Sequence, residues 1–270
     1  MNAPRSGEVE LLHRIGLGVQ RVVRDAAQSP HRADVIAMGA DGSPTEELDR
    51  VAESEVLRQM DELGVDWNVV SEEIGSVRRG GDRTLVVDPV DGTTNALRHL
   101  PFSAVSLALG RDDLGGVDVG LVRDLARGTT YWAERGRGAF RDGRPIRVRP
   151  WKGRGELVLV NLGEVASERA VGLAGKVRRV RSLGCASLEM ILVAEGAADG
   201  YLFENAEPKR NLRATDIAAA YRILLEAGGG AADSSGRSLE NFPLSVTERT
   251  TLAAWGDAAL APRLLAGEAP

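Results

Sequence analysis

With 270 residues, 43% of them hydrophobic and 27% charged, the chain has the composition of an ordinary globular protein, which excludes a disordered tail, a fibrous repeat and a membrane bundle. The formal net charge is -5 and the arginines are scattered, so nucleic acid is not an expected partner. No stretch reaches the ~18 uninterrupted apolar residues of a membrane span. One cysteine, Cys185, rules out an intrachain disulfide, and we expect a cytoplasmic protein without a membrane partner.

The N-terminal part of the chain predicts two helices. Apolar residues at helical spacing from Leu12 to Ala26 indicate an amphipathic helix. The run Ser43-Pro44-Thr45-Glu46 predicts the start of a second helix, with a capping serine, proline in the first turn and glutamate three residues after the cap. Gly64 is the expected end of that helix.

Short apolar and β-branched runs follow and predict strands, with a hairpin turn at Asp142-Gly143. The expected strands of this part cover residues 68–70, 84–87, 104–109, 117–122 and 129–134. Later in the chain we expect strands at 157–160, 177–181, 201–203 and 251–255, which alternate with helices at 164–174, 186–195, 215–227 and the C-terminus. The pattern predicts an antiparallel-rich α+β half over 1–150 and an α/β half over 151–270, joined in one compact unit.

The richest local signal is the segment 85–95, an apolar strand that ends in Asp88 and presents Asp91 three residues later. Two carboxylates around one turn suit a hard divalent cation, which also accepts a backbone carbonyl such as that of Val90. Gly92-Thr93-Thr94 follows at an expected helix start, where backbone N–H groups can bind an anion. A cation beside an anion site indicates phosphate chemistry. The alternative is a structural Asp-Pro turn in which Asp91 caps a helix.

Two further acidic segments are ambiguous when each is taken alone. Ser71-Glu72-Glu73 ends another apolar strand, where side chains commonly enter a site, but the same pattern fits an acidic loop. Asp216 opens a helix that ends in Glu226-Ala227-Gly228-Gly229. An aspartate in a first turn is also favoured by the helix dipole, without any functional role.

Together these segments resemble the inositol monophosphatase superfamily, the metal-dependent sugar phosphatases that include fructose-1,6-bisphosphatases. The first signature of that family, Asp-Pro-(Ile/Leu/Val)-Asp-Gly-Thr-Thr-Asn, is complete at 88–95. The second, an aspartate at a helix start followed by small residues and Glu-Ala-Gly-Gly, is present at 216–229, and the upstream acidic pair at 72–73. The resemblance covers nearly the whole chain and implies a layered αβαβα sandwich that acts as one catalytic unit.

The resemblance implies a site for two or three Mg²⁺ ions, with Mn²⁺ as a possible substitute. The implied ligands are Glu72, Asp88, Val90 through its backbone carbonyl, Asp91 and Asp216, with Asp49 at a third and weaker position. Glu72 and Thr93 are implied to orient and deprotonate the attacking water, and Asp49 to accept a hydrogen bond from Thr93. If so, Asp91→Asn abolishes activity with little loss of thermal stability.

The resemblance also implies which residues hold the substrate. Gly92, Thr93 and Thr94 are expected to bind the phosphate. The other implied contacts are Arg181, Gly184, Cys185, Ala186, Glu204 and Arg210, with Glu207 as a rival to Glu204 and Lys209 as a rival to Arg210 for a second phosphate. Cys185 is expected to be a packed small residue, because no base that would activate a nucleophilic cysteine is found.

The segments 39–45 and 71–75 look like those of the archaeal-type members, which often act on both inositol monophosphate and fructose-1,6-bisphosphate. We therefore expect a Mg²⁺-dependent phosphatase of small phosphate esters, and the resemblance implies a homodimer. A phosphatase for adenosine bisphosphate or NADP is the alternative within the class. A catalytically inactive sugar-phosphate-binding protein is the alternative from another class, although all four main metal carboxylates are present.

Overall fold

The computed structural model describes residues 6–40, 42, 44–207 and 211–266. The helices are α1 (Gly7–Ala26), α2 (Glu47–Leu63), α3 (Thr93–Leu97), α4 (Glu168–Lys176), α5 (Ala186–Ala194), α6 (Ala214–Glu226) and α7 (Ala261–Ala266), with a short 3₁₀ helix at Ala258–Leu260. The strands are β1 (Val35–Met38), β2 (Pro44–Glu46), β3 (Asn68–Ser71), β4 (Gly75–Val77), β5 (Thr84–Asp91), β6 (Ala104–Gly110), β7 (Val117–Asp124), β8 (Thr130–Glu134), β9 (Gly138–Arg141), β10 (Arg144–Ile146), β11 (Leu157–Val160), β12 (Arg179–Arg181), β13 (Gly200–Phe203), β14 (Gly230–Ala232) and β15 (Leu252–Trp255).

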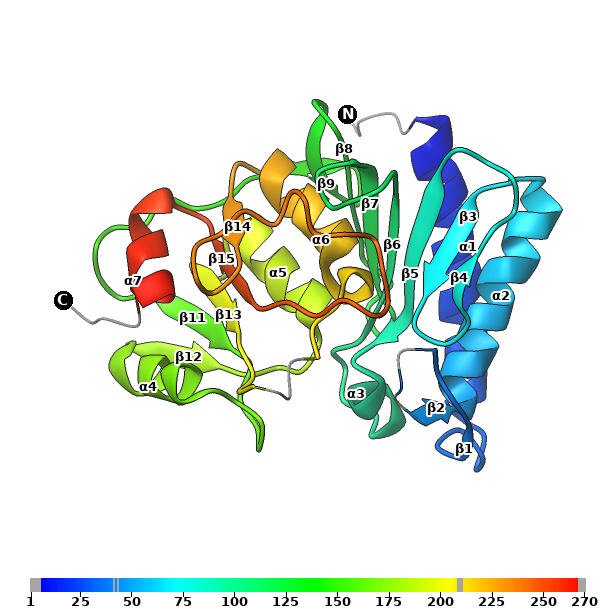
Figure 1. Cartoon of the computed structure of the whole chain (residues 1–270), viewed down its shortest axis with the longest axis horizontal. Helices are drawn as coiled ribbons and strands as arrows, with labels where there is room; N and C mark the ends of the chain where they lie inside the picture. Colours follow the sequence, from blue (N-terminus) through cyan, green and yellow to red (C-terminus); the bar gives the residue numbers. More distant parts are fainter. Residues whose placement is uncertain (1–5, 41, 43, 208–210, 267–270) are drawn as a thin grey trace.

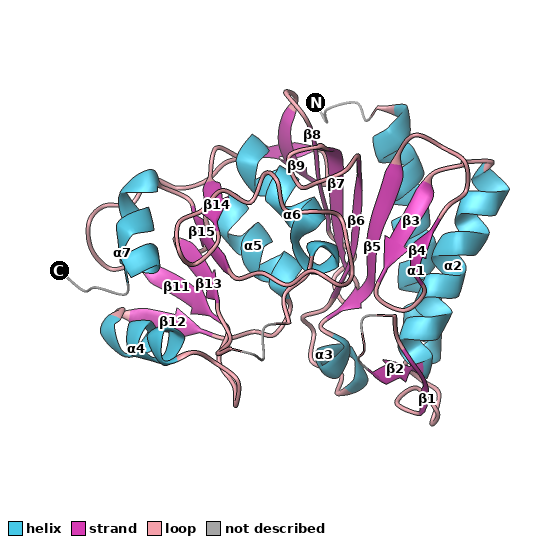
Figure 2. Cartoon of the chain, in the orientation of Figure 1, coloured by secondary structure: helices cyan, strands magenta, loops and turns pink. Residues whose placement is uncertain are grey.

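These elements form five layers, which Figure 1 shows from right to left. Helices α1 and α2 cover the outer face of an eight-stranded sheet with the order β10-β9-β8-β7-β6-β5-β3-β4. Helices α5 and α6 separate it from a five-stranded sheet with the order β12-β11-β13-β15-β14, whose far face is covered by α4 and α7. Figure 2 shows the same alternation of helical and extended layers. The αβαβα sandwich implied by the resemblance is confirmed.

Apolar side chains fill the space between each pair of layers. Leu12 and Ile15 of α1 are fully buried against the first sheet, as the amphipathic pattern predicts. Helix α6 packs so closely on β7 that a Cβ atom added at Gly120 would lie 2.4 Å from the carbonyl oxygen of Ala219. Since a real Cβ atom cannot approach a backbone oxygen so closely, glycine at this position brings α6 directly against the sheet.

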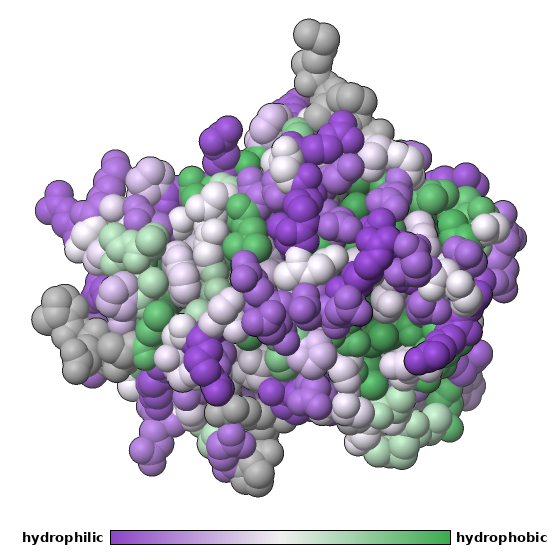
Figure 3. Space-filling model, turned by 45° about the horizontal axis from the view of Figure 1, so that its top comes forward, coloured by the Kyte–Doolittle hydropathy of each residue, from purple (hydrophilic) through white to green (hydrophobic). Residues whose placement is uncertain are grey.

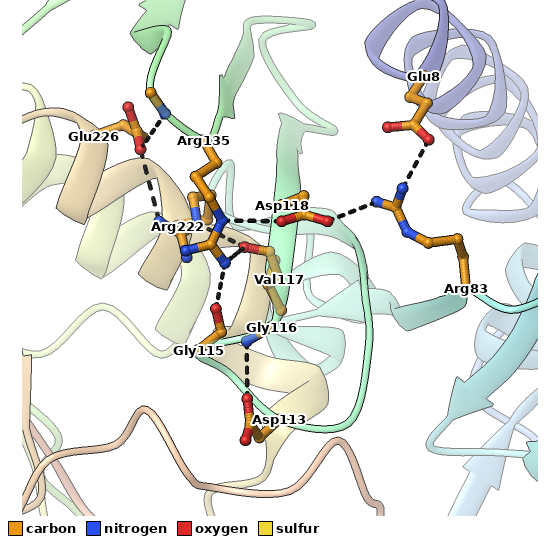
Figure 4. Close-up of polar contacts among 11 residues, drawn as sticks. Glu8, Arg83, Asp113, Gly115, Gly116, Val117, Asp118, Arg135, Arg222 and Glu226 are labelled. Carbon is orange, nitrogen blue, oxygen red and sulfur yellow. Dashed lines mark hydrogen bonds and ion pairs between the residues drawn. The ribbon is translucent and has the colours of Figure 1, made fainter.

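The C-terminal end of α6 is fastened to the first sheet by charged side chains (Figure 4). Arg222 donates from Nε to the carbonyl oxygen of Val117, at 2.8 Å. The two carboxylate oxygens of Glu226 accept from the backbone N–H groups of Gly136 and Gly138, at 2.9 and 3.0 Å. The second signature and the glycines of the β8–β9 turn are therefore joined in space, and this contact fixes the helix whose first turn carries Asp216.

The expected start of the second helix is wrong. Ser43 lies outside the described residues, and Pro44–Glu46 form the strand β2, so that α2 begins only at Glu47. Antiparallel pairing of β2 with β1 holds the backbone extended, with Thr45 opposite Ala37. Pairing with the preceding strand thus overrides the helix signal of this segment. The expected end is correct, since Gly64 adopts a left-handed conformation after α2.

The later boundaries also shift. Helix α4 begins at Glu168 instead of near 164, because Ser167 accepts from the N–H of Ala170 and caps the helix there. Within the described residues, no helix is long and apolar enough to cross a membrane. Figure 3 shows hydrophilic side chains over much of one face, with hydrophobic ones in smaller groups between them.

Candidate active site

A cavity of about 230 Å³ lies where the carboxyl end of β5 meets α3 and the first turns of α5 and α6. Five acidic side chains contribute to its wall, an unusual concentration for one cavity. They are Glu72, Asp88, Asp91, Glu189 and Asp216. Val90, Gly92, Thr93, Gly184, Cys185 and Ala186 line it as well. The structure thus gathers residues of the two signatures and Glu72 of the upstream acidic pair around one space.

Asp88 enters the cavity because β5 is irregular at its carboxyl end. Asp88 pairs with Ser106 and Asp91 with Ala104, so β5 has one residue more than β6 in this interval. Such a bulge contains Pro89, which has no N–H to give to the ladder. The Asp88 carboxylate accepts from the N–H of Val90, at 3.1 Å, which fixes the turn.

Three carboxylates are near enough to share one cation. Oxygen atoms of Glu72, Asp88 and Asp216 all lie within 4.8 Å of one another. Burial and the charge of Asp216 raise the pKa of Glu72 well above its usual range, and burial with the charge of Glu72 does the same for Asp88. Arg213 is the nearby cation, with Nη1 3.5 Å from Glu72 Oε2. The three carboxylates repel one another, and a bound cation would relieve that repulsion. Their oxygen atoms are the ligands that a divalent metal such as Mg²⁺ prefers.

Asp91 lines the same cavity, but its carboxylate points to the first turn of α5. It accepts from the N–H groups of Ala186 and Ser187, at 3.1 and 2.6 Å, and from the Ser187 hydroxyl, at 2.5 Å. The thiol of Cys185 lies 3.1 Å away. Asp91 therefore caps a helix, as the alternative interpretation of the turn requires, but it caps one from the other half of the chain. Oδ1 accepts only the N–H of Ala186, so its second lone pair is free to join the carboxylates of the cavity.

The hydrogen bond expected between Thr93 and Asp49 is present. Thr93 Oγ1 lies 3.0 Å from Asp49 Oδ1 and 2.8 Å from the carbonyl oxygen of Val90. Burial, followed by the contact with Glu46 and the charge of Glu73, raises the pKa of Asp49 to about 8. The threonine hydroxyl thus sits between the first signature and α2, with its orientation fixed from both sides.

Asn95, the last residue of the first signature, joins the two halves of the chain. Its Nδ2 donates to the carbonyl oxygens of Phe102 and Leu183, at 2.8 and 2.7 Å. A Cβ atom added at Gly92, whose φ is 82°, would lie 3.0 Å from the carbonyl oxygen of Gly184. Glycine at 92 and asparagine at 95 therefore hold the 183–185 loop against the turn that follows β5.

Sequence reasoning missed Glu189, which is 1% exposed and lines the cavity. It accepts from the N–H of Leu183, at 3.0 Å, and burial raises its pKa to about 7 despite that hydrogen bond. The available signal is its context, a single acid in the otherwise apolar run from Leu188 to Ala194. Such an acid is buried with its helix and needs a partner.

Several expected substrate contacts do not reach the cavity. The carboxylate of Glu204 forms an ion pair with Arg169 of α4, at 2.6 Å, which turns it away. Arg181 is exposed and donates to the carbonyl oxygen of Val180, and Thr94 is exposed outside the cavity lining. Arg210 and its rival Lys209 lie outside the described residues.

Comparison with known proteins agrees with this geometry. A model of the inositol monophosphatase family matches residues 8–266. The chain belongs to the inositol monophosphatase family. A fructose-1,6-bisphosphatase/inositol-1-monophosphatase from Methanothermobacter thermautotrophicus is 33% identical over 268 residues, covering 93% of each chain. A bifunctional NADP phosphatase/NAD kinase from Methanococcus maripaludis is 30% identical over 90% of this chain, but only 46% of its own length is matched.

A solved structure supports the same assignment. A Pyrococcus horikoshii protein, described as having similarities to inositol-1 monophosphatase, superposes with a TM-score of 0.82 and 28% identity. The match covers 97% of this chain and 98% of that one. The five-layer arrangement that brings the family signatures together is thus shared over nearly the full length of both proteins.

The acidic cavity leads to a pH prediction. Without a divalent cation, fold stability should fall as the pH rises from about 4, near the unfolded pKa values, to about 8. The pKa values of Asp91, Glu189 and Asp49 are raised to about 6, 7 and 8, with burial as the main cause. The folded chain then retains protons that the unfolded chain has already lost, so stability is complete below the unfolded pKa values and is lost through the folded ones. Thermal melts in chelator across this range test it, and a flat or rising profile would contradict it.

Proposed function

We propose that this protein hydrolyses the phosphate monoesters of sugars and polyols in a Mg²⁺-dependent reaction. The observation that carries the proposal is the trio of Glu72, Asp88 and Asp216, within 4.8 Å of one another beside the Gly92 turn. A phosphate dianion cannot approach three carboxylates unless cations neutralise them. A divalent metal supplies that neutralisation and lowers the pKa of water. Mn²⁺ is the expected substitute, since it also favours oxygen ligands.

In the proposed reaction, the residues of this chain orient the attacking water and the phosphate. Glu72 lines the cavity, where its carboxylate can accept a hydrogen bond or a proton from the water. The Thr93 hydroxyl donates to Asp49 and can therefore accept a hydrogen bond from the same water. The backbone of Gly92 and Thr93 lines the cavity at the start of α3, where the resemblance expects the phosphate. Direct attack by water is proposed, without a phosphoenzyme.

A substrate panel tests this proposal and its alternatives. Phosphate release is measured from inositol 1-phosphate, fructose 1,6-bisphosphate, adenosine bisphosphate and NADP, each with Mg²⁺ and with chelator. Phosphate release from the first two esters with Mg²⁺, and none with chelator, supports the proposal. A preference for NADP would favour the nucleotide alternative, which the similarity to the Methanococcus maripaludis protein makes worth including. Binding without turnover of any ester would favour the inactive sugar-phosphate-binding protein.

Two other expectations remain predictions. The homodimer rests on the resemblance alone, and light scattering of the purified chain tests it. The cytoplasmic location rests on composition, and fractionation of the source cells tests it.

A further inference from the structure

Three asparagine side chains form a hydrogen-bonded row beside the cavity. Asn161 follows β11, Asn205 follows β13, and Asn211 precedes α6. Asn161 donates from Nδ2 to Asn205 Oδ1, at 3.1 Å, and Asn205 donates from Nδ2 to Asn211 Oδ1, at 2.5 Å. Asn161 and Asn211 line the cavity that contains the carboxylate trio, whereas Asn205 is buried behind them, 3% exposed. We call these three residues the amide row.

The backbone holds each member of the amide row in place. The N–H of Asn161 donates to the carbonyl oxygen of Leu202, at 2.9 Å. On either side of Asn205, the carbonyl oxygen of Glu204 and the N–H of Ala206 bond to the 165–167 segment. Beyond Asn211, the carbonyl oxygen of Leu212 accepts from the N–H of Thr250, at 2.9 Å. Three separate segments are thus anchored so that their amides meet.

The row leaves a carbonyl oxygen without a hydrogen bond at one end and an NH₂ group without one at the other. A side-chain amide has one carbonyl oxygen and one NH₂ group, and the two internal hydrogen bonds use both groups of Asn205. The carbonyl oxygen of Asn161 and the NH₂ group of Asn211 have no partner among the described residues. Turning all three amides over would exchange the two ends, but one donor and one acceptor would remain.

This pair of groups suits hydroxyls better than a second phosphate. A hydroxyl both donates and accepts, so two hydroxyls of one ligand can satisfy both ends of the row. A phosphate dianion only accepts, and it would leave the acceptor end unpaired inside the cavity at a desolvation cost. We propose that the amide row reads the hydroxyl groups of a sugar or polyol phosphate, with Asn161 and Asn211 as specificity-determining residues and Asn205 as the positioning residue that orders them. This inference rests on the proposed function and adds which side of the cavity holds the alcohol part of the substrate.

The test compares two substrates that share a phosphate but differ in their hydroxyls. Inositol 1-phosphate carries hydroxyls next to the ester, whereas p-nitrophenyl phosphate has none. In Asn161→Ala and Asn211→Ala, we expect kcat/KM for inositol 1-phosphate to fall about five-fold each, the value of one neutral hydrogen bond. For p-nitrophenyl phosphate, kcat/KM should change less than about two-fold, because this substrate has no hydroxyl that the removed side chain could contact. Inhibition by inorganic phosphate should be unchanged.

Asn205→Asp tests the positioning role, since a carboxylate accepts from Asn161 but cannot donate to Asn211. We expect it to raise KM for inositol 1-phosphate more than it lowers kcat, with no change for the aryl ester. Asn241→Ala is the matched control, an exposed asparagine outside the cavity lining. This control should change kcat/KM for neither substrate.

The outcomes separate failure of the inference from failure of the proposed function. If the wild-type chain with Mg²⁺ releases phosphate from no ester, the proposed function fails. If the wild-type chain is active but the variants lower kcat/KM equally for both substrates, or for neither, the amide row does not recognise hydroxyls.

Discussion

Asp88→Asn is expected to lower kcat/KM for phosphate esters by at least about 100-fold, because even residues that only orient metal ligands cost 10–100-fold when they are changed. The same substitution should leave the metal-free fold as stable as the wild type, or more stable. Burial and the neighbouring charges of Glu72 and Asp91 raise the pKa of Asp88, so a neutral side chain removes repulsion from the empty cavity. Thermal melts with and without Mg²⁺, together with steady-state kinetics, measure both effects. The stabilisation by Mg²⁺ should be largely lost.

Asp199→Asn is the matched control for this substitution. Asp199 is equally buried, 4% exposed against 5% for Asp88, but it lies outside the cavity. Its carboxylate accepts from Arg149 and from the N–H of Leu157, both at 2.8 Å. We expect a loss of stability of about 1–3 kcal/mol with activity retained. If Asp88→Asn destabilises the metal-free chain as much as Asp199→Asn does, Asp88 is a structural residue and the assignment of the trio fails.

Asp91→Asn is expected to lower activity and stability together. The sequence alone predicts little loss of stability, but the structure shows that this carboxylate accepts from two backbone N–H groups and a hydroxyl at the start of α5. An amide turns an NH₂ group toward at least one of these donors, so one buried donor is left unpaired. The expected cost is about 1–3 kcal/mol of unfolding free energy, in addition to at least about 100-fold in kcat/KM.

Denaturant unfolding in chelator separates the two effects of Asp91→Asn, since no metal contributes there. Ser187→Ala is the control, because it removes only the hydroxyl donor at 2.5 Å and leaves the charge of Asp91 in place. It should cost about 0.5–1.5 kcal/mol, the usual value of one hydrogen bond, and retain most of the activity. Full stability of Asp91→Asn would show that its contacts with α5 contribute nothing.

The sequence predicted the residues that a motif or the family resemblance names, and it did not predict contacts that neither indicates. The first signature presents Asp88 and Thr93 through a strand end, a bulge and a helix start, all of which are local features. Pro44 is an equally local signal, yet pairing with β1 made the prediction wrong. Glu204 does not line the cavity, because its carboxylate pairs with Arg169, which no motif indicates, and its role in substrate binding stays a prediction.

The sequence analysis missed two further residues for the same reason. Glu189 and Asn205 carry no motif, and each acquires its role only when segments from different layers meet. Asp91 is the intermediate case. Its place in the turn follows from the signature, whereas its contacts with α5 depend on how the two halves of the chain pack. The local sequence pattern thus predicts where the acidic side chains of the site lie in the chain, and the packing of the layers determines which residues contact them.

Helix α6 connects the cavity to a distant part of the first sheet. It is 13 residues long, about 20 Å, with Asp216 in its first turn and Glu226 at its last position. Because Glu226 accepts from the N–H groups of Gly136 and Gly138, helix α6 connects the β8–β9 hairpin to one of the three clustered carboxylates. We therefore expect substitutions in the β8–β9 turn, which does not line the cavity, to change the affinity for a cation while every residue of the cavity stays the same.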